Sequence, residues 1–576
     1  MLQKLRLKLA SAEALPLLVL LGIVSGLFAG GIIILLRLLI ETLQAKFLPD
    51  GNPENYEALA LWMRFLLPLS GALLIGIVFR LLYKGPVQVG VVHVLERLQY
   101  HQGNIPVRNF IAQFIGAAIS IISGHSVGRE GPGVHLGAAG TSFLGQWMKL
   151  PNNSLRILVA CGAAASIAAS FNTPIAGVIF AMEVIVMEYT IAGFAPIIMS
   201  AVSATVLTQA VFGKEPVFSV QALQLSNLTE LVFLLFMGLT IGALAALFIW
   251  VLRITTNKTQ KIAFMNRMLL AGLITGICAL WVPQIMGIGY DTVNATIMGE
   301  LGVGLLLTIV FVKLLATTLG LGLGLPAGLI GPTVVIGAAA GGVVGSLAHA
   351  LMPGEVASAG FYAMLGMAAM MGATLQAPLA ALMALLELTV NTNIILPGML
   401  VVIVAGLTSS HLFRQESVFL MLLKERGLDF KSNPVAQALR RVGVAGEMSR
   451  SFLRTPNLLR RNEAQALLQN EPEWLVVEKD NVPVALMPSV ELAHYLTMNQ
   501  QDEVDLLEIP GQRYDCAMIG IRDTLQLALE QMDQRHLDVL CVGHKKLGQN
   551  DEQTSVDYQV HGILTRQMLE THYRFH

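Results

Sequence analysis

The sequence predicts a largely α-helical, multi-pass membrane domain of two inverted repeats with half-spanning helices, followed by an α+β cytosolic domain. The 576 residues are 54% hydrophobic and only 13% charged, with a mean hydropathy of +0.65. A soluble domain carries roughly 25% charged residues, so lipid must solvate much of this chain. In addition, interrupted apolar segments recur at matching places in two halves of the chain, and the C-terminal part returns to an ordinary soluble composition.

The change in composition near Gly427 sets the expected domains. Residues 1–427 form the membrane region, with repeat halves at about 14–215 and 225–427, and residues 428–576 form the soluble region. Basic residues before the first apolar run, with no small-residue cleavage site, predict a retained first helix and a cytoplasmic N-terminus. The expected location is a cell membrane, the bacterial inner membrane, with both the N-terminus and the soluble tail cytoplasmic.

The apolar segments differ in length. Residues 15–40 and 229–253 are long enough to span a bilayer, which takes roughly 20 apolar residues, whereas residues 131–144 and 331–347 are short and contain Gly or Pro. Non-helical backbone at membrane depth survives only inside protein or beside water. Several helices are therefore expected to stop midway and point their ends at an aqueous pathway.

An internal repeat supports this architecture. Residues 131–145, GPGVHLGAAGTSFLG, match residues 331–345, GPTVVIGAAAGGVVG, at a shift of 200. A second pair, FNTPIAGVIFAMEV from Phe171 and LQAPLAALMALLEL from Leu375, follows in the same order at a shift of 204. Repeated halves with interrupted segments in corresponding places indicate a transporter-type site at the repeat interface.

The second repeat block also aligns two carboxylates, Glu183 and Glu387. We interpret them as structural carboxylates at helix ends, with a role in an intracellular vestibule as the alternative. The soluble region alternates short elements. Its predicted strands are Trp474–Val477, Val539–Val542 and Val560–Leu564, and Thr524–Gln534 is a predicted helix.

A candidate gate lies in the stretch GHSVGREGP, residues 124–132. It places Arg129 and Glu130 in a glycine-framed turn just before an apolar helix. Ionisable residues at membrane depth are expensive and functional by default. A helix N-terminus stabilises a carboxylate through its exposed amides and dipole, and it would hold a free anion for the same reason. Glu130 is therefore predicted to compete with a permeating anion and to swing aside when repelled or protonated.

The matching stretch in the second half, GLPAGLIGP at residues 324–332, carries no charge. Its glycines expose the amides of Leu329 and Ile330 at another helix start. Two converging helix N-termini make an anion-selective pocket without a full charge. The anion-binding residues predicted from the two stretches are Gly128, Arg129, Gly131, Gly328, Leu329 and Ile330.

These motifs resemble the CLC family of chloride channels and chloride/proton antiporters. The resemblance rests on GREGP, GLPAGLIGP, FNTPIAGVIFAMEV and ELTVNTNIILPGM (residues 387–399), in the family's order across the membrane region. It implies transport of chloride or another small anion, a homodimer in the lipid bilayer with one pore per subunit, and Glu130 as the external gating glutamate. The soluble tail resembles a pair of CBS modules, most clearly in LDVLCVG followed by VHGILTRQML.

Three positions depart from the family pattern. Antiporters typically carry an internal proton-relay glutamate where this chain has Val184, and a valine there resembles the channels. Val89, followed by Gly90, stands where the pore serine is expected, and Phe419 stands where the pore tyrosine is expected. Without these two hydroxyls, the central anion site would rely on backbone amides. The sequence thus favours a passive channel of the voltage-gated type over a coupled chloride/proton antiporter, which is the alternative.

Other functions have less support. The net charge of −1 argues against nucleic-acid binding, and no Walker A lysine, metal cluster or Ser/His/Asp set predicts an enzyme or a cofactor. CBS modules that bind adenine nucleotides commonly end in Thr or Ser followed three places later by Asp. Here Thr565 precedes Met568 and Pro488 precedes Glu491, so a dimerising or conformational role is favoured over nucleotide binding. A remote alternative is a non-transporting membrane sensor that signals through the tail.

Overall fold

The computed structural model divides the chain into two compact units. One comprises residues 18–146 and 156–430, and the other comprises residues 1–17, 147–155 and 431–576. The structure describes residues 9, 14–83, 85–189, 191–214, 218, 225, 227, 229–353, 356–428, 434–479, 482–547 and 556–575.

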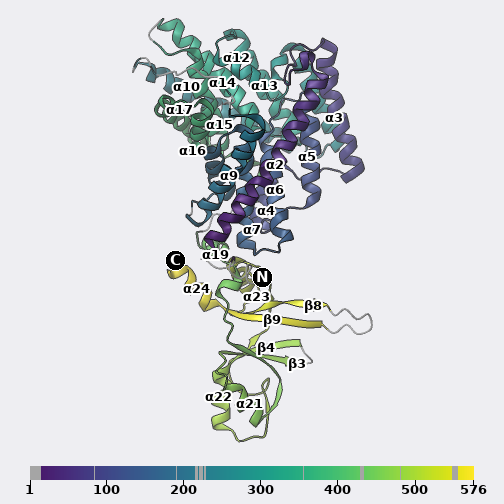
Figure 1. Cartoon of the computed structure of the whole chain (residues 1–576), viewed down its shortest axis with the longest axis vertical. Coiled ribbons are helices and arrows are strands. Elements are labelled where there is room, and N and C mark those ends of the chain that lie inside the picture. The colour runs from purple at the N-terminus through teal and green to yellow at the C-terminus, as the bar shows by residue number, and fades with distance from the viewer. Residues whose placement is uncertain are drawn as a thin grey trace. The chain divides into compact units, whose positions relative to one another are not determined.

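The first unit is a bundle of apolar helices, drawn from purple to green in Figure 1. Within the described residues, nine helices are long and apolar enough to cross a membrane, and α2 and α10 confirm the long segments predicted at 15–40 and 229–253. The helices of the first half are α2 (Leu15–Phe47), α3 (Leu61–Tyr83), α4 (Gly90–Tyr100), α5 (Val107–Ile122), α6 (Glu130–Trp147), α7 (Asn152–Phe171), α8 (Pro174–Phe180), the π-helical η2 (Ala181–Val186) and α9 (Ile191–Phe212). Those of the second half are α10 (Glu230–Thr259), α11 (Phe264–Trp281), α12 (Tyr290–Ile297), α13 (Val303–Gly322), α14 (Ile330–Leu351), α15 (Ala359–Leu375), α16 (Pro378–Thr389), α17 (Ile395–Leu407) and α18 (Val418–Lys424).

The helix starts reproduce the sequence repeat. Helices α4 and α12 begin at Gly90 and Tyr290, and α6 and α14 begin at Glu130 and Ile330, both at a shift of 200. One expectation is corrected. The second-half segment predicted as short is a helix of 22 residues that continues through residues 348–351.

The two halves hold each other through a reciprocal pair of carboxylates. Glu183 of the first half accepts hydrogen bonds at the start of α16, and Glu387 of the second half accepts them at the start of α8. The donors to Glu183 are the amides of Leu379 (3.3 Å) and Ala380 (2.8 Å), and those to Glu387 are the amides of Ile175 (2.9 Å) and Ala176 (2.7 Å). Each carboxylate is thus a structural group at the start of a helix in the other half. This reciprocal pair of contacts has the two-fold symmetry expected of inverted halves.

Close helix packing depends on glycine, most clearly between α14 and α15. A Cβ atom on Gly337 would lie 2.3 Å from the carbonyl oxygen of Gly366, and one on Gly366 would lie 2.2 Å from the carbonyl oxygen of Gly337. Small residues let helix backbones approach where lipid removes the hydrophobic driving force between helices. These glycines therefore set the spacing of the layer behind the start of α14.

The second unit contains two small mixed sheets with helices, which confirms the α+β prediction for the tail. The strands run in the order β1-β3-β4-β6 and β7-β8-β9, with a further pair β2-β5. The three predicted strands fall in β3, β8 and β9, and the predicted helix is α23. The bounds are β1 (Phe452–Pro456), β2 (Leu458–Arg460), α21 (Arg461–Leu468), β3 (Trp474–Lys479), β4 (Val482–Pro488), α22 (Ser489–Met498), β5 (Glu503–Asp505), β6 (Tyr514–Asp515), β7 (Met518–Ile519), α23 (Leu525–Arg535), β8 (Val539–Leu547), β9 (Val556–Thr565) and α24 (Arg566–Phe575), preceded by α19 (Pro434–Arg440) and α20 (Val444–Glu447).

The packing of α14 on α15 makes a testable prediction. Gly337→Ala should lower the thermal midpoint of the purified protein, because overpacking a close contact costs about 1–3 kcal/mol. Gly304→Ala in α13 is the matched control, since a Cβ there meets nothing within 4 Å. Thermal unfolding in detergent, followed by size-exclusion chromatography, measures both. A Gly337→Ala midpoint equal to that of the control would contradict the packing argument.

Candidate functional site

The two glycine-rich turns predicted to face each other are joined by main-chain hydrogen bonds. The amide of Gly128 donates to the carbonyl of Gly328 at 2.7 Å, and the amide of Gly328 donates to the carbonyl of Gly128 at 2.9 Å. A Cβ on Gly131 would lie 2.9 Å from the Cα of Gly328. Only glycine permits this approach, and it places the starts of α6 and α14 against each other.

The side chain of Glu130 is fully buried at this junction. Its Oε2 accepts a hydrogen bond from the amide of Gly331 at 3.1 Å, and its Oε1 accepts one from the hydroxyl of Tyr290. The carboxylate of the first half therefore lies at the helix start of the second half, where exposed amides and the helix dipole favour a negative charge. The donating amide lies just beyond those of Leu329 and Ile330, the two that the sequence motif predicted.

Arg129 supplies the compensating positive charge. Its Nε lies 4.0 Å from Oε1 of Glu130, and its guanidinium carbon lies 5.7 Å from the ring centre of Tyr290. It also donates to Glu41 at 3.5 Å and to the carbonyl of Ser170 at 3.3 Å. A buried carboxyl group is strongly destabilising without such a partner, and Arg129 lies close enough to Glu130 to provide one.

A cavity of about 580 Å³ leads to this junction. It reaches Gly131 and Gly328, whereas Glu130 does not line it. Six of the predicted residues line this single cavity: Val89, Gly90, Gly131, Gly328, Leu329 and Phe419. The other predicted residues, Gly128, Arg129 and Ile330, lie outside its lining. The structure thus brings six of the nine predicted anion-binding residues together around one cavity.

The cavity is not lined by backbone amides alone, as the missing hydroxyls at Val89 and Phe419 had suggested. Thr256, Gln260 and Arg267 also line it and offer side-chain donors. These residues lie on α10, just after it and on α11, outside the sequence motifs that located the site.

The amide of Gly90 is already occupied. It donates to Oε1 of Gln113 at 2.7 Å, and Nε2 of Gln113 donates to the carbonyl of Pro326 at 2.9 Å. Gln113 thus ties the start of α4 to the second-half turn, and sequence reasoning missed it. Gly90 contributes space to the cavity, since its amide is not available to an anion in this arrangement.

Val184 lies in η2, fully enclosed by apolar neighbours. Its neighbour Glu183 is engaged at the start of α16. The position expected to relay protons in an antiporter therefore presents a buried aliphatic side chain.

Sequence reasoning also overlooked Tyr290, whose hydroxyl donates to Glu130. Tyr290 begins α12. The centre of its ring lies 6.0 Å from that of Phe171 and 5.7 Å from that of Phe218. The repeat contained a usable indication, because the shift of 200 carries Gly90, an expected pore position, onto Tyr290.

Comparisons with known proteins identify related chains. The family model described as "Voltage gated chloride channel" matches residues 71–410. The chain is 31% identical over 395 residues to a ClcB-like chloride channel protein of Ralstonia nicotianae, covering 68% of this chain and 92% of that protein. It is 30% identical over 294 residues to the H(+)/Cl(-) exchange transporter ClcA of Vibrio cholerae, covering 50% of this chain and 63% of that protein.

Solved structures show the same fold. A slow cyanobacterial Cl−/H+ antiporter aligns with a TM-score of 0.63 at 22% identity, covering 71% of this chain and 97% of that chain. A eukaryotic CLC transporter aligns with a TM-score of 0.59 at 18% identity, covering 96% of this chain and 97% of that chain.

The hydrogen bond from Tyr290 generates a second prediction. Tyr290→Phe removes one donor to the Glu130 carboxylate, and a hydrogen bond to a charged group contributes about 1.5–3 kcal/mol. If release of Glu130 limits transport, anion flux into liposomes should rise by about tenfold or more.

Tyr362→Phe is the matched control, since its buried hydroxyl donates to Glu230 at 2.9 Å and neither residue lines the cavity. Its flux should equal that of the unmodified protein. Equal flux in a normally folded Tyr290→Phe protein would contradict a restraining role for Tyr290.

Proposed function

We propose, from the premise that this chain belongs to the voltage gated chloride channel (CLC) family, that it transports chloride across a membrane through a pathway gated by Glu130. One observation carries the proposal: the Glu130 carboxylate accepts the amide of Gly331 at 3.1 Å, at the start of α14. That position suits any small anion, so the side chain and a chloride ion compete for it.

The proposed transport step follows from this competition. Chloride enters the cavity lined by Gly131, Gly328 and Leu329 and approaches the helix starts. Its charge repels the Glu130 carboxylate, or a proton neutralises it, and the side chain leaves the amide of Gly331. Chloride then takes the vacated donors. Arg129 stays beside the junction and keeps the local charge favourable to an anion.

Passive conduction of the voltage-gated type is our preferred form of this activity. Val184 is apolar and buried, and Glu183 is engaged at a helix start, so neither offers a free internal carboxylate. Protons then lack an evident relay from the inner side to Glu130.

Coupled chloride/proton exchange is the second candidate. Relatives at similar identity are named both as ClcB chloride channels and as ClcA exchange transporters, and a solved antiporter has this fold. We further propose that the protein is a homodimer in the bacterial inner membrane. Its N-terminus and its CBS-like tail would both be cytoplasmic.

Neutralising the gate is the first test. Glu130→Gln keeps the shape of the side chain and removes its charge, so it should raise chloride flux by about tenfold, as a protonated gate would. Glu300→Gln, an exposed carboxylate just before α13, should leave flux unchanged. Chloride efflux from liposomes measures both, and reduced flux in correctly folded Glu130→Gln would disprove the gating role.

A reversal-potential measurement separates the two forms of transport. Purified protein in liposomes under a chloride gradient should reverse at the chloride Nernst potential and ignore an imposed proton gradient. A shift with the proton gradient would establish coupled exchange instead. Glu130→Gln is the control, because a shift that depends on the protein should vanish in this variant, whereas a proton leak would persist.

A further inference from the structure

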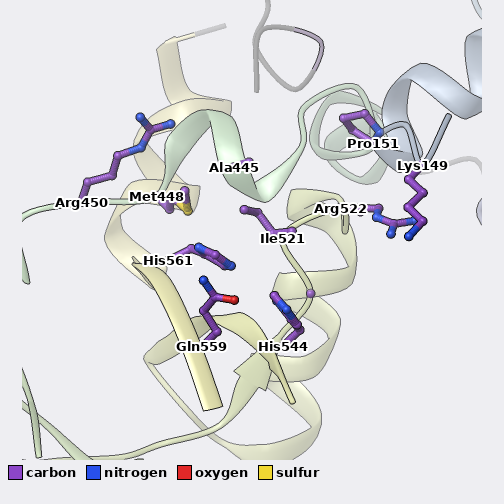
Figure 2. Close-up of a pocket in the computed structure, with 11 residues that line it drawn as sticks. Lys149, Pro151, Ala445, Met448, Arg450, Ile521, Arg522, His544, Gln559 and His561 are labelled. Atoms are coloured by element: carbon purple, nitrogen blue, oxygen red, sulfur yellow. The ribbon is translucent and has the colours of Figure 1, made fainter. Parts of the chain in front are cut away.

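The second compact unit contains a cavity of about 680 Å³ that the transport pathway does not use. Figure 2 shows its lining residues, which come from the 147–155 segment, the chain around α20, the turn before α23, and strands β8 and β9. Its charged lining residues are all cationic, namely Lys149, Arg450 and Arg522. Several aspartates and glutamates lie elsewhere in this unit, but among its described residues none belongs to the lining of the cavity.

Main-chain hydrogen bonds fix the walls of this cavity. The amide of Val444 donates to the carbonyl of Asp523 at 2.8 Å, and Ser449 and Ile563 exchange two bonds at 2.8 and 2.9 Å. The Asp523 carboxylate accepts the amide of Gly520 at 2.9 Å. The cavity is therefore part of the folded unit and not a gap between loose side chains.

Two of the cationic residues come from distant parts of the chain. The amide of Asn152 donates to the carbonyl of Arg522 at 2.9 Å, and its side chain donates to the Asp523 carboxylate at 3.1 Å. These bonds hold the segment carrying Lys149 against the turn carrying Arg522. Asp523, the acid next to Arg522 in the chain, is thus already engaged by Gly520 and Asn152, and it lies outside the cavity lining.

A pair of stacked histidines forms another wall. His544 of β8 and His561 of β9 have ring centres 5.4 Å apart and planes inclined by 22°. In Figure 2 both rings, with the amide of Gln559, point into the cavity. Burial and the neighbouring His544 lower the pKa of His561 below its usual value, so it is neutral at pH 7. The imidazole and amide groups add hydrogen-bonding atoms to the three cationic side chains of the lining.

We propose that this cavity binds a small phosphate-bearing anion. Arginine and lysine side chains on different walls suit a ligand with several negatively charged oxygens, and such groups bind phosphate strongly. The volume is that of a small-molecule site, larger than a halide needs. Thr565 and Pro488, the module ends at which the sequence was searched for nucleotide binding, do not line the cavity.

The position of Lys149 gives the site a connection to the gate. Residues 147–155 join α6 to α7, and α6 begins with Glu130. A ligand held by both Lys149 and Arg522 would restrain the chain segment that continues from the gating helix. The binding proposal itself does not rest on the transport proposal.

The test is a titration of the full-length protein with inorganic pyrophosphate by isothermal calorimetry. Nanodiscs of phosphatidylcholine alone keep anionic lipid headgroups out of the measurement. We expect saturable binding that weakens as salt is raised. The double variant Lys149→Gln/Arg522→Gln should weaken binding at least tenfold. Arg535→Gln, which removes one exposed charge outside the lining, should leave it unchanged.

Either of two calorimetric results would overturn the proposal, namely no saturable binding by the unmodified protein or equal affinity in the double variant, and a third comes from lipid vesicles. Chloride flux without pyrophosphate should be the same in the double variant as in the unmodified protein, which verifies that the variant is folded. If binding holds while the protein moves no chloride, only the transport proposal fails. Tighter binding when phosphatidylglycerol vesicles replace pyrophosphate would assign the site to lipid headgroups and overturn a soluble ligand.

Discussion

The pair of main-chain hydrogen bonds between Gly128 and Gly328 is the constraint on which the site depends. It joins the two halves of the membrane unit at their interrupted segments, within 2.7 and 2.9 Å. Side chains would prevent this approach, because a Cβ atom on Gly328 would lie only 2.8 Å from the amide nitrogen of Gly131. Once the turns are joined, α6 and α14 must begin next to each other. Their exposed amides then face the same small volume. The carboxylate of Glu130, in the first half, accepts a hydrogen bond from the amide of Gly331 in the second half. The reciprocal hydrogen bonds of Glu183 and Glu387 join the two halves at a second place.

The buried carboxyl group at the junction needs several partners at once. A carboxylate removed from water costs several kcal/mol unless it is paired and hydrogen-bonded. Arg129, Tyr290 and the amide of Gly331 together provide that compensation. A gate held too firmly would never open, and Arg129 remains 4.0 Å from the carboxylate without a close ion pair. The donors that bind Glu130 are of a kind that a chloride ion could also accept, so in the proposed mechanism the closed and conducting states would use the same donors.

Much of this arrangement could be predicted from local patterns. Hydropathy and the repeat shift predicted the helical halves, and GREGP located the turn that carries Glu130, because these features depend on residues adjacent in sequence. Tyr290, Gln113 and Arg267 were missed because their roles arise only when distant helices meet. The length of α14 was also underestimated, since Gly and Pro at its start were taken to shorten it. A glycine-rich helix is stable here because its glycines allow close packing on α15.

The two halves share one arrangement of helices, but they differ at corresponding positions beside the junction. At the repeat shift of 200, Gly90 begins α4 and Tyr290 begins α12. The glycine leaves space, and the cavity extends past it to Gly131 and Phe419. The tyrosine fills the corresponding space with a ring packed between Phe171 and Phe218 and places its hydroxyl on Glu130. The first-half position therefore borders a cavity, whereas the second-half position is filled by an aromatic side chain. Because the halves are related by a two-fold operation, a small residue in one half and an aromatic residue in the other make the two sides of the junction different, as a pathway gated at one end would require.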